Sequence, residues 1–80
     1  MITSEQVRAA RALLRWEQKD LAETSKVSLP SIKRLEGQPG PLAAQDRTVD
    51  AIEAAFVTAG VLFLDAGAMT EGGAGVRLKR

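Results

Sequence analysis

The sequence predicts a mainly α fold in which four helices precede a short β segment. Eighty residues suffice for one domain, and 45% of them are hydrophobic. Before residue 60, apolar residues recur every three to four positions in several stretches, which is the spacing of a helix face. After residue 60 they are consecutive or alternate, as is typical of strands. We therefore expect a helical domain at residues 1–60 and a β segment at residues 61–80.

A first helix is expected over residues 4–15. Thr3 and Gln6 have the spacing of a capping box, in which two side chains satisfy free N–H groups at a helix start. Four apolar side chains of this helix are expected to face the core: Val7, Ala10, Leu13 and Leu14. Trp16, the only tryptophan, is interpreted as core filler between the first two helices rather than as a ligand-stacking residue.

Residues 18–36, QKDLAETSKVSLPSIKRLE, predict two short helices joined by a sharp turn. Ser28 offers a hydroxyl to cap the second helix, and Pro30 fits its first turn, where no N–H is needed. The inward face of this second helix is formed by two apolar residues, Ile32 and Leu35. Its outer face is cationic and apolar, which indicates a surface for contact: Leu29, Pro30, Lys33 and Arg34.

The next stretch predicts a loop and then a fourth helix. Two glycines and two prolines at residues 37–41 end the preceding helix and disfavour regular structure. Thr48 is expected to cap a helix that reaches Ala59, and Gly60 suits the position after its end. The inward stripe of this helix is expected to contain five residues: Val49, Ile52, Ala55, Phe56 and Ala59.

Two strands are expected at residues 61–65 and 76–79, with a loop between them. The GGAG run in this loop is interpreted as a flexible segment rather than a phosphate loop, because no Lys-Ser/Thr pair and no helix follow it. An apolar strand whose edge has unpaired N–H and C=O groups tends to pair with another strand, so the segment is expected to form a dimer. The two strands pair either within one chain or by exchange between chains. The expected dimer residues are Val61, Leu62, Phe63, Leu64, Val76 and Leu78.

Residues 18–36 resemble the helix-turn-helix of the XRE group, the phage-repressor-like transcriptional regulators. Ala22 matches a position that needs a small side chain for close helix crossing, and Val27 matches the apolar residue of the turn. Lys26 replaces a common glycine, and a left-handed lysine costs about 1 kcal/mol. Glu17 replaces a frequent Ser or Asn cap, and its carboxylate still suits the helix dipole. The resemblance implies a lambda-repressor-like bundle of four helices with a short C-terminal β-hairpin or exchanged strands.

The resemblance extends to both ends of the chain. The tail is similar to that of small stand-alone XRE-type proteins, which end in a G-V-x-F strand and a G-V-R-L-[KR] strand. Arg11 matches an arginine that members pair with the glutamate ending the recognition helix, which is Glu36 in this chain. The resemblance therefore implies a bidentate pair that fixes the pitch of the recognition helix. The alternative is that both residues are independent surface charges.

Composition excludes several function classes. Without cysteine or histidine, the chain lacks thiol nucleophiles, imidazole bases and the usual zinc ligands, so we expect no metal, no cofactor and no enzyme activity. No apolar run reaches bilayer length and the N-terminus lacks a signal-peptide pattern, so we expect a cytoplasmic protein without a membrane partner.

The charges are unevenly distributed along the chain. Residues 1–35 carry seven basic and four acidic side chains, residues 36–75 carry one basic and six acidic side chains, and the last five residues carry three basic side chains. A basic first half is consistent with a nucleic-acid face.

The resemblance implies a sequence-specific transcriptional regulator, such as a repressor, that binds a two-fold operator in double-stranded DNA as a homodimer. Arg34 and Lys33 are expected to read guanine in the major groove, although a phosphate contact is an equal alternative for Lys33. The loop at residues 37–41 is expected to offer N–H groups to phosphates, with help from Gln38 and Arg47. The expected DNA-binding residues are Gln18, Ser28, Leu29, Pro30, Ser31, Lys33, Arg34 and Gln38.

A second function remains open beside DNA binding. Some small helix-turn-helix proteins of this type are antiactivators, which bind and mask another transcription factor, with or without binding DNA. The apolar tail and the acidic fourth helix suit such a protein partner. The salt dependence of DNA binding distinguishes the two functions, because phosphate contacts produce a steep negative slope.

Overall fold

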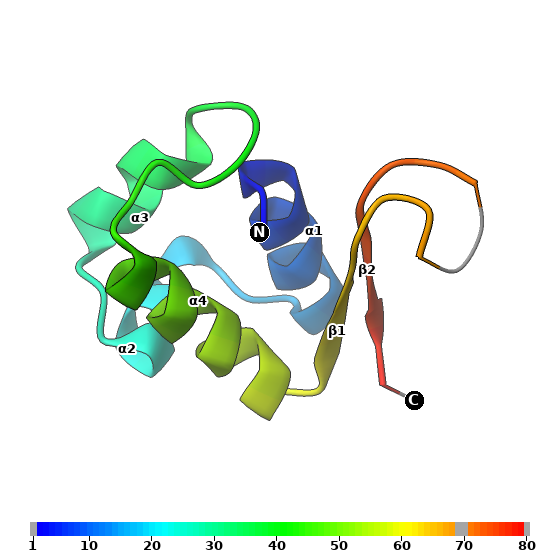
Figure 1. Ribbon diagram of the computed structural model, residues 1–80. Coiled ribbons are helices and arrows are strands. Elements are labelled where there is room, and N and C mark those ends of the chain that lie inside the picture. Colours follow the sequence, from blue (N-terminus) through cyan, green and yellow to red (C-terminus); the bar gives the residue numbers. More distant parts are fainter. Residues whose placement is uncertain (1, 69–70, 80) are drawn as a thin grey trace.

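The structure is a computed structural model that describes residues 2–68 and 71–79. The chain folds into four helices followed by a two-stranded antiparallel sheet, as Figure 1 shows, so the predicted mainly α architecture is confirmed at this level. Positions 69 and 70 of the expected 66–75 loop lie outside the described residues, as does the last basic residue of the tail. The elements are α1 Ser4–Leu14, α2 Gln18–Ser25, α3 Leu29–Glu36, α4 Asp46–Thr58, β1 Val61–Leu64 and β2 Gly75–Leu78.

Local signals place the start of α1 as predicted. The backbone N–H of Gln6 donates to Thr3 Oγ1 over 3.1 Å, and the backbone N–H of Thr3 donates to Gln6 Oε1 over 2.9 Å. These two bonds complete the expected capping box. The helix ends at Leu14, one residue earlier than predicted, because Arg15 adopts a left-handed conformation with φ of 57°.

The turn between α2 and α3 contains the predicted left-handed lysine. Lys26 has a φ of 65°, and its N–H bonds to the carbonyl of Ala22 at the end of α2. α3 then begins after Ser28, whose hydroxyl oxygen accepts the N–H of Ser31 over 3.3 Å. A lysine at positive φ costs about 1 kcal/mol, so the turn holds modest strain.

α4 begins earlier than predicted. The residue before the helix is Gln45 and not Thr48, because the N–H groups of Thr48 and Val49 already bond to the carbonyl of Gln45. The expected inward position of Ala59 is also wrong, since this side chain is exposed. The helix ends at Thr58, and the chain turns at Gly60, whose φ of 100° suits glycine, toward β1.

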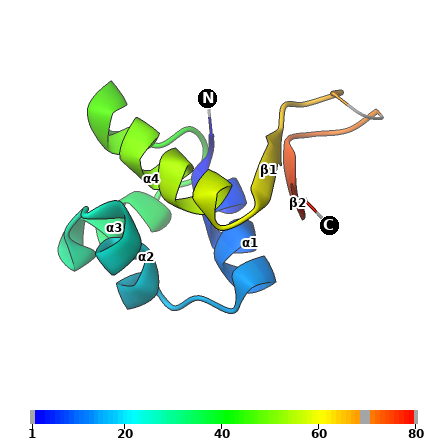
Figure 2. The same ribbon diagram turned by 90° about the horizontal axis from the view of Figure 1, so that it is seen from below.

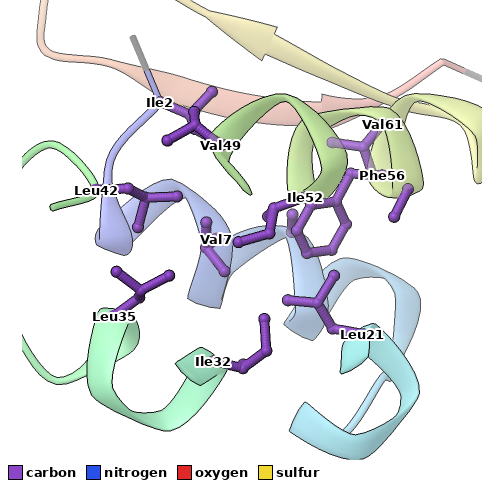
Figure 3. Close-up of a cluster of buried hydrophobic side chains, with 12 residues drawn as sticks. Ile2, Val7, Leu21, Ile32, Leu35, Leu42, Val49, Ile52, Phe56 and Val61 are labelled. Atoms are coloured by element: carbon purple, nitrogen blue, oxygen red, sulfur yellow. The ribbon is translucent and has the colours of Figure 1, made fainter. Parts of the chain in front are cut away.

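The core lies between the four helices and the inner face of the hairpin, as Figure 3 shows. Its largest buried side chain, Phe56, stacks on Trp16 with ring centroids 5.6 Å apart and meets Phe63 edge-on at 5.9 Å. Trp16 therefore packs against the core as expected. Leu13 does not, since 41% of it is exposed. The buried apolar residues are Ile2, Val7, Ala10, Leu21, Ile32, Leu35, Leu42, Val49, Ile52, Ala55, Phe56 and Val61.

The loop before α4 is fastened to the N-terminus. Thr3 and Pro41 form an isolated antiparallel bridge, and the N–H of Ser4 bonds to the carbonyl of Gly40 over 2.9 Å. The expectation that residues 37–41 lack regular pairing is therefore wrong at Pro41. Two further apolar side chains, Ile2 and Leu42, enter the core beside this bridge.

The two strands pair with each other within the chain, with Phe63 opposite Val76 in an antiparallel register. Figure 2 shows the hairpin at the side of the bundle away from α3. Val61 is 1% exposed, so its side chain belongs to the core of the single chain rather than to its surface. Phe63 and Val76 also pack against the core, because they share the inner face of the hairpin with Val61. No helix among the described residues is long and apolar enough to cross a membrane.

Candidate nucleic-acid interface

α3 is buried on one face and free on the other. Ile32 and Leu35 are at most 2% exposed and hold the helix against the core. Pro30, Lys33 and Arg34 are exposed on the opposite side. Within residues 2–68 and 71–79, neither of these cations has a carboxylate partner in an ion pair. Two adjacent cations without internal partners are available to an anionic ligand.

At the start of α3, two hydroxyls bond to each other. The Ser28 hydroxyl donates to Ser31 Oγ over 2.8 Å while its oxygen accepts the N–H of Ser31. Its proton is therefore already used within the protein. To donate to a phosphate as expected, the Ser28 hydroxyl must rotate and break its bond to Ser31. The Ser31 hydroxyl, in contrast, still has its own proton to donate. Leu29 lies beside them and is half-buried.

Arg11 and Glu36 form the expected bidentate pair. Nε and Nη2 of Arg11 donate to the two carboxylate oxygens of Glu36, each over 2.7 Å. Glu36 is 4% exposed, and the third nitrogen of Arg11 donates to the carbonyl of Trp16 over 3.1 Å. Arg8 bonds to the backbone carbonyl of Glu36 over 2.8 Å, so the end of α3 has two arginine partners on α1. The pair fixes the position of α3 relative to α1.

Gln18 belongs to this inner network. Its side-chain amide donates to Glu36 Oε1 over 3.2 Å, and the residue is half-buried at the first position of α2. One of its two amide protons is therefore occupied. For the expected contact to a DNA phosphate, Gln18 can use its second amide proton. The backbone N–H groups at the start of α2, which lack a partner within the helix, can also contribute.

The loop after α3 is less open than the sequence suggested. The N–H of Gly40 donates to both carboxylate oxygens of Glu5, over 3.1 and 3.3 Å, so it is not free for a phosphate. Hydrogen bonds from the backbone N–H groups of Glu5 itself and of Gly40, with a smaller contribution from the nearby Arg8, lower the pKa of Glu5. Gln38 and Arg47 are exposed on either side of this segment.

A groove between α3 and the start of α4 was not predicted. It brings the expected DNA-binding residues Ser31 and Arg34 together with Gln45 and Thr48, which the sequence analysis had not included. The side chain of Gln45 does not cap α4, so the first N–H groups of this helix have no side-chain partner at that position. Sequence spacing could not find this groove, because its two walls come from separate segments of the chain, residues 27–34 and 43–48. Its lining is Val27, Ser31, Arg34, Ala43, Ala44, Gln45 and Thr48.

The described residues contain no group of three or more acidic side chains that could hold a metal ion. The exposed groups of α3 and of the groove donate hydrogen bonds and positive charge, which suits phosphates and base edges. Comparison of the chain with protein-family models, characterised proteins and solved structures finds no match, so the interface rests on its own geometry.

Proposed function

We propose that this protein is a sequence-specific DNA-binding regulator of transcription, with α2 and α3 as a lambda-repressor-like helix-turn-helix of the XRE type. The observation that supports this proposal most directly is that contacts hold the inner side of α3, whereas its outer side is exposed. Arg11, Gln18 and the core hold its position, while Lys33 and Arg34 are exposed and form no ion pair with another described residue. A rigid helix with a cationic outer face fits the major groove of B-DNA.

Arg34 and Lys33 have different tasks in this proposal. The Arg34 guanidinium can donate two hydrogen bonds to O6 and N7 of one guanine, which specifies that base. Lys33 supplies either a second base contact or a phosphate contact. Pro30 and Leu29 lack donors, so they shape the fit or touch thymine methyl groups.

Phosphate contacts come from the segments around α3. The groove places Ser31 and the start of α4 beside Arg34, and Gln18 lies at the first position of α2, where backbone N–H groups lack a partner within the helix. Gln38 and Arg47 extend this line of donors. Such contacts position the protein and supply the salt-dependent part of the affinity.

One α3 covers only a few base pairs, so specific binding requires two copies on a two-fold operator. We therefore propose a cytoplasmic homodimer.

The second candidate function, an antiactivator, has support in α4. Its outer face combines exposed acidic side chains with Val57, which is 51% exposed, and this surface suits a protein partner better than DNA: Asp46, Asp50 and Val57.

Selection of bound duplexes from a random pool tests the proposal. A regulator of this type should enrich one two-fold sequence, and its affinity for that sequence should fall steeply with salt. A pool without enrichment, together with specific capture of a transcription factor, would favour the antiactivator instead.

A further inference from the structure

The outer edge of β2 is the open end of the sheet. β1 lies next to α4, and Val61 at its start is fully covered. β2 lies on the other side of the hairpin, above α1, and Figures 1 and 2 both show it at the end of the molecule away from α3. The outer edge of β2 can accept another strand. A two-stranded sheet is marginal by itself, and a free edge is a template for pairing.

The hairpin register determines which groups this edge offers. The N–H of Lys79 bonds to the carbonyl of Gly60 over 2.7 Å, so alternate pairs of the ladder are hydrogen-bonded from this point. Arg77 therefore bonds toward β1, whereas the N–H and C=O groups of Val76 and Leu78 point outward. Among the described residues, no other segment bonds to these four outward groups. The edge thus presents two donors and two acceptors.

We propose that this edge pairs with the same edge of a second copy, giving a four-stranded antiparallel sheet whose two-fold axis passes beside Val76. The side-chain sequence of the edge selects this register. Centring on Arg77 would place two arginines opposite each other, and centring on Leu78 would place Arg77 opposite the partner's Lys79. Like charges in opposite positions destabilise a strand pair.

Centring on Val76 avoids both conflicts. Gly75 then lies opposite the partner's Arg77, and Ala74 lies opposite the partner's Leu78. The small residues that precede Val76 therefore face the large ones that follow it, and the edge is complementary to itself. A two-fold interface requires this kind of self-complementarity.

One side of α1 would pack against the added strand. Gln6, Ala9 and Leu13 follow one another along one side of α1 at helical spacing, and the Gln6 amide bonds to the hairpin carbonyls of Leu64 and Gly75 over 3.2 and 2.9 Å. Ala9 and Leu13 are exposed on that side of α1, and α1 packs against β2. A partner strand beyond β2 would cover them, which accounts for an apolar side chain that the monomer leaves 41% exposed.

This inference rests on the homodimer in the proposed function and not on DNA contact, so it is tested without DNA. The chain has no cysteine, and Val76→Cys therefore carries a single thiol. Its Cα atoms would be about 5.5 Å apart across the axis, within the range of a disulfide. We expect rapid and nearly complete cross-linking under mild oxidation. Val57→Cys, on exposed α4, and Arg77→Cys, which would face glycine, should cross-link at least tenfold more slowly.

Sedimentation of Leu78→Pro provides an independent measurement. Proline removes an N–H that points outward, so the intrachain ladder keeps its bonds and only the partner's bond is lost. We expect the helical circular dichroism to be kept and the dimer dissociation constant to rise at least tenfold. A monomeric wild-type chain, or a dimer in which Val76→Cys cross-links no faster than Val57→Cys, would overturn the inference. Cross-linking of Arg77→Cys would overturn the register. A dimer that passes these tests without binding DNA would contradict only the proposed function.

Discussion

Arg11 and Glu36 connect α1 to the last residue of α3 through two hydrogen bonds of 2.7 Å each. The Glu36 side chain is almost completely shielded, while the Arg11 side chain is 20% exposed. Because Gln18 from α2 bonds to the same carboxylate, three helices meet at one side chain. The orientation of α3, and with it the direction of its outer face, depends on this junction.

A double-mutant cycle should detect this coupling. Arg11→Met leaves a shielded carboxylate without its partner, which should lower the free energy of unfolding by about 2–4 kcal/mol. With Glu36→Gln as the second variant, the coupling energy from denaturant unfolding should exceed about 1 kcal/mol. The exposed pair of Lys19 and Glu17, 3.6 Å apart, is the matched control and should be additive within about 0.5 kcal/mol. Additivity at Arg11 and Glu36 would show that the pair does not link the helices.

Lys26→Gly should stabilise the protein by about 0.5–1 kcal/mol. The φ of 65° at this position is strained for lysine and free for glycine. Thermal unfolding followed by circular dichroism measures the effect. Lys19→Gly, inside α2, should instead destabilise by about 1 kcal/mol. A lower midpoint for Lys26→Gly would mean that the turn does not hold this conformation.

Phe56→Ala should cost about 3–5 kcal/mol, because it removes the largest fully buried side chain and its contacts with Trp16 and Phe63. Much of the domain's stability would be lost, and Trp16 fluorescence would report the change directly. Val57→Ala, at a neighbouring exposed position, should change stability by less than about 0.5 kcal/mol. Similar effects at the two positions would contradict the core described above.

The Glu5 carboxylate should make stability depend on pH. Its pKa is lowered in the folded state, so the ionised form stabilises the fold at neutral pH. This contribution is lost as the pH falls through the ordinary glutamate range and through the lowered folded pKa. Unfolding midpoints measured from pH 7 to pH 3 should fall less steeply for Glu5→Gln than for the wild type. Parallel curves would show that the bond to Gly40 does not contribute.

The spacing of residues correctly predicted the features that depend on neighbouring residues in the chain. The capping box at Thr3 and Gln6 and the inward position of Ile32 follow from contacts within one helical turn or one face. The start of α4 was mistaken because a Thr hydroxyl is a common cap, whereas the helix here begins without a side-chain cap at Gln45. Val61 was assigned to a dimer because an apolar run does not reveal which of its faces meets the core.

Contacts between distant segments could not be predicted. The bonds from Gly40 to Glu5 and from Gln6 to the hairpin join positions 35 to 69 residues apart, and no spacing signals them. The link between Arg11 and Glu36 was expected only through the family resemblance, because 25 residues separate the two. The groove beside Arg34 likewise required the folded arrangement of α3 and α4.

Arg34→Ala tests the central proposal most directly, through its affinity for a selected duplex and for a random duplex at the same salt concentration. The variant should lose about 1–3 kcal/mol on the selected site and much less on random DNA, because a base contact is lost. Arg15→Gly, which removes one charge at a left-handed position that suits glycine, should weaken both duplexes slightly and equally. An equal loss on both duplexes for Arg34→Ala, or no affinity of the wild type for either, would contradict base reading by α3.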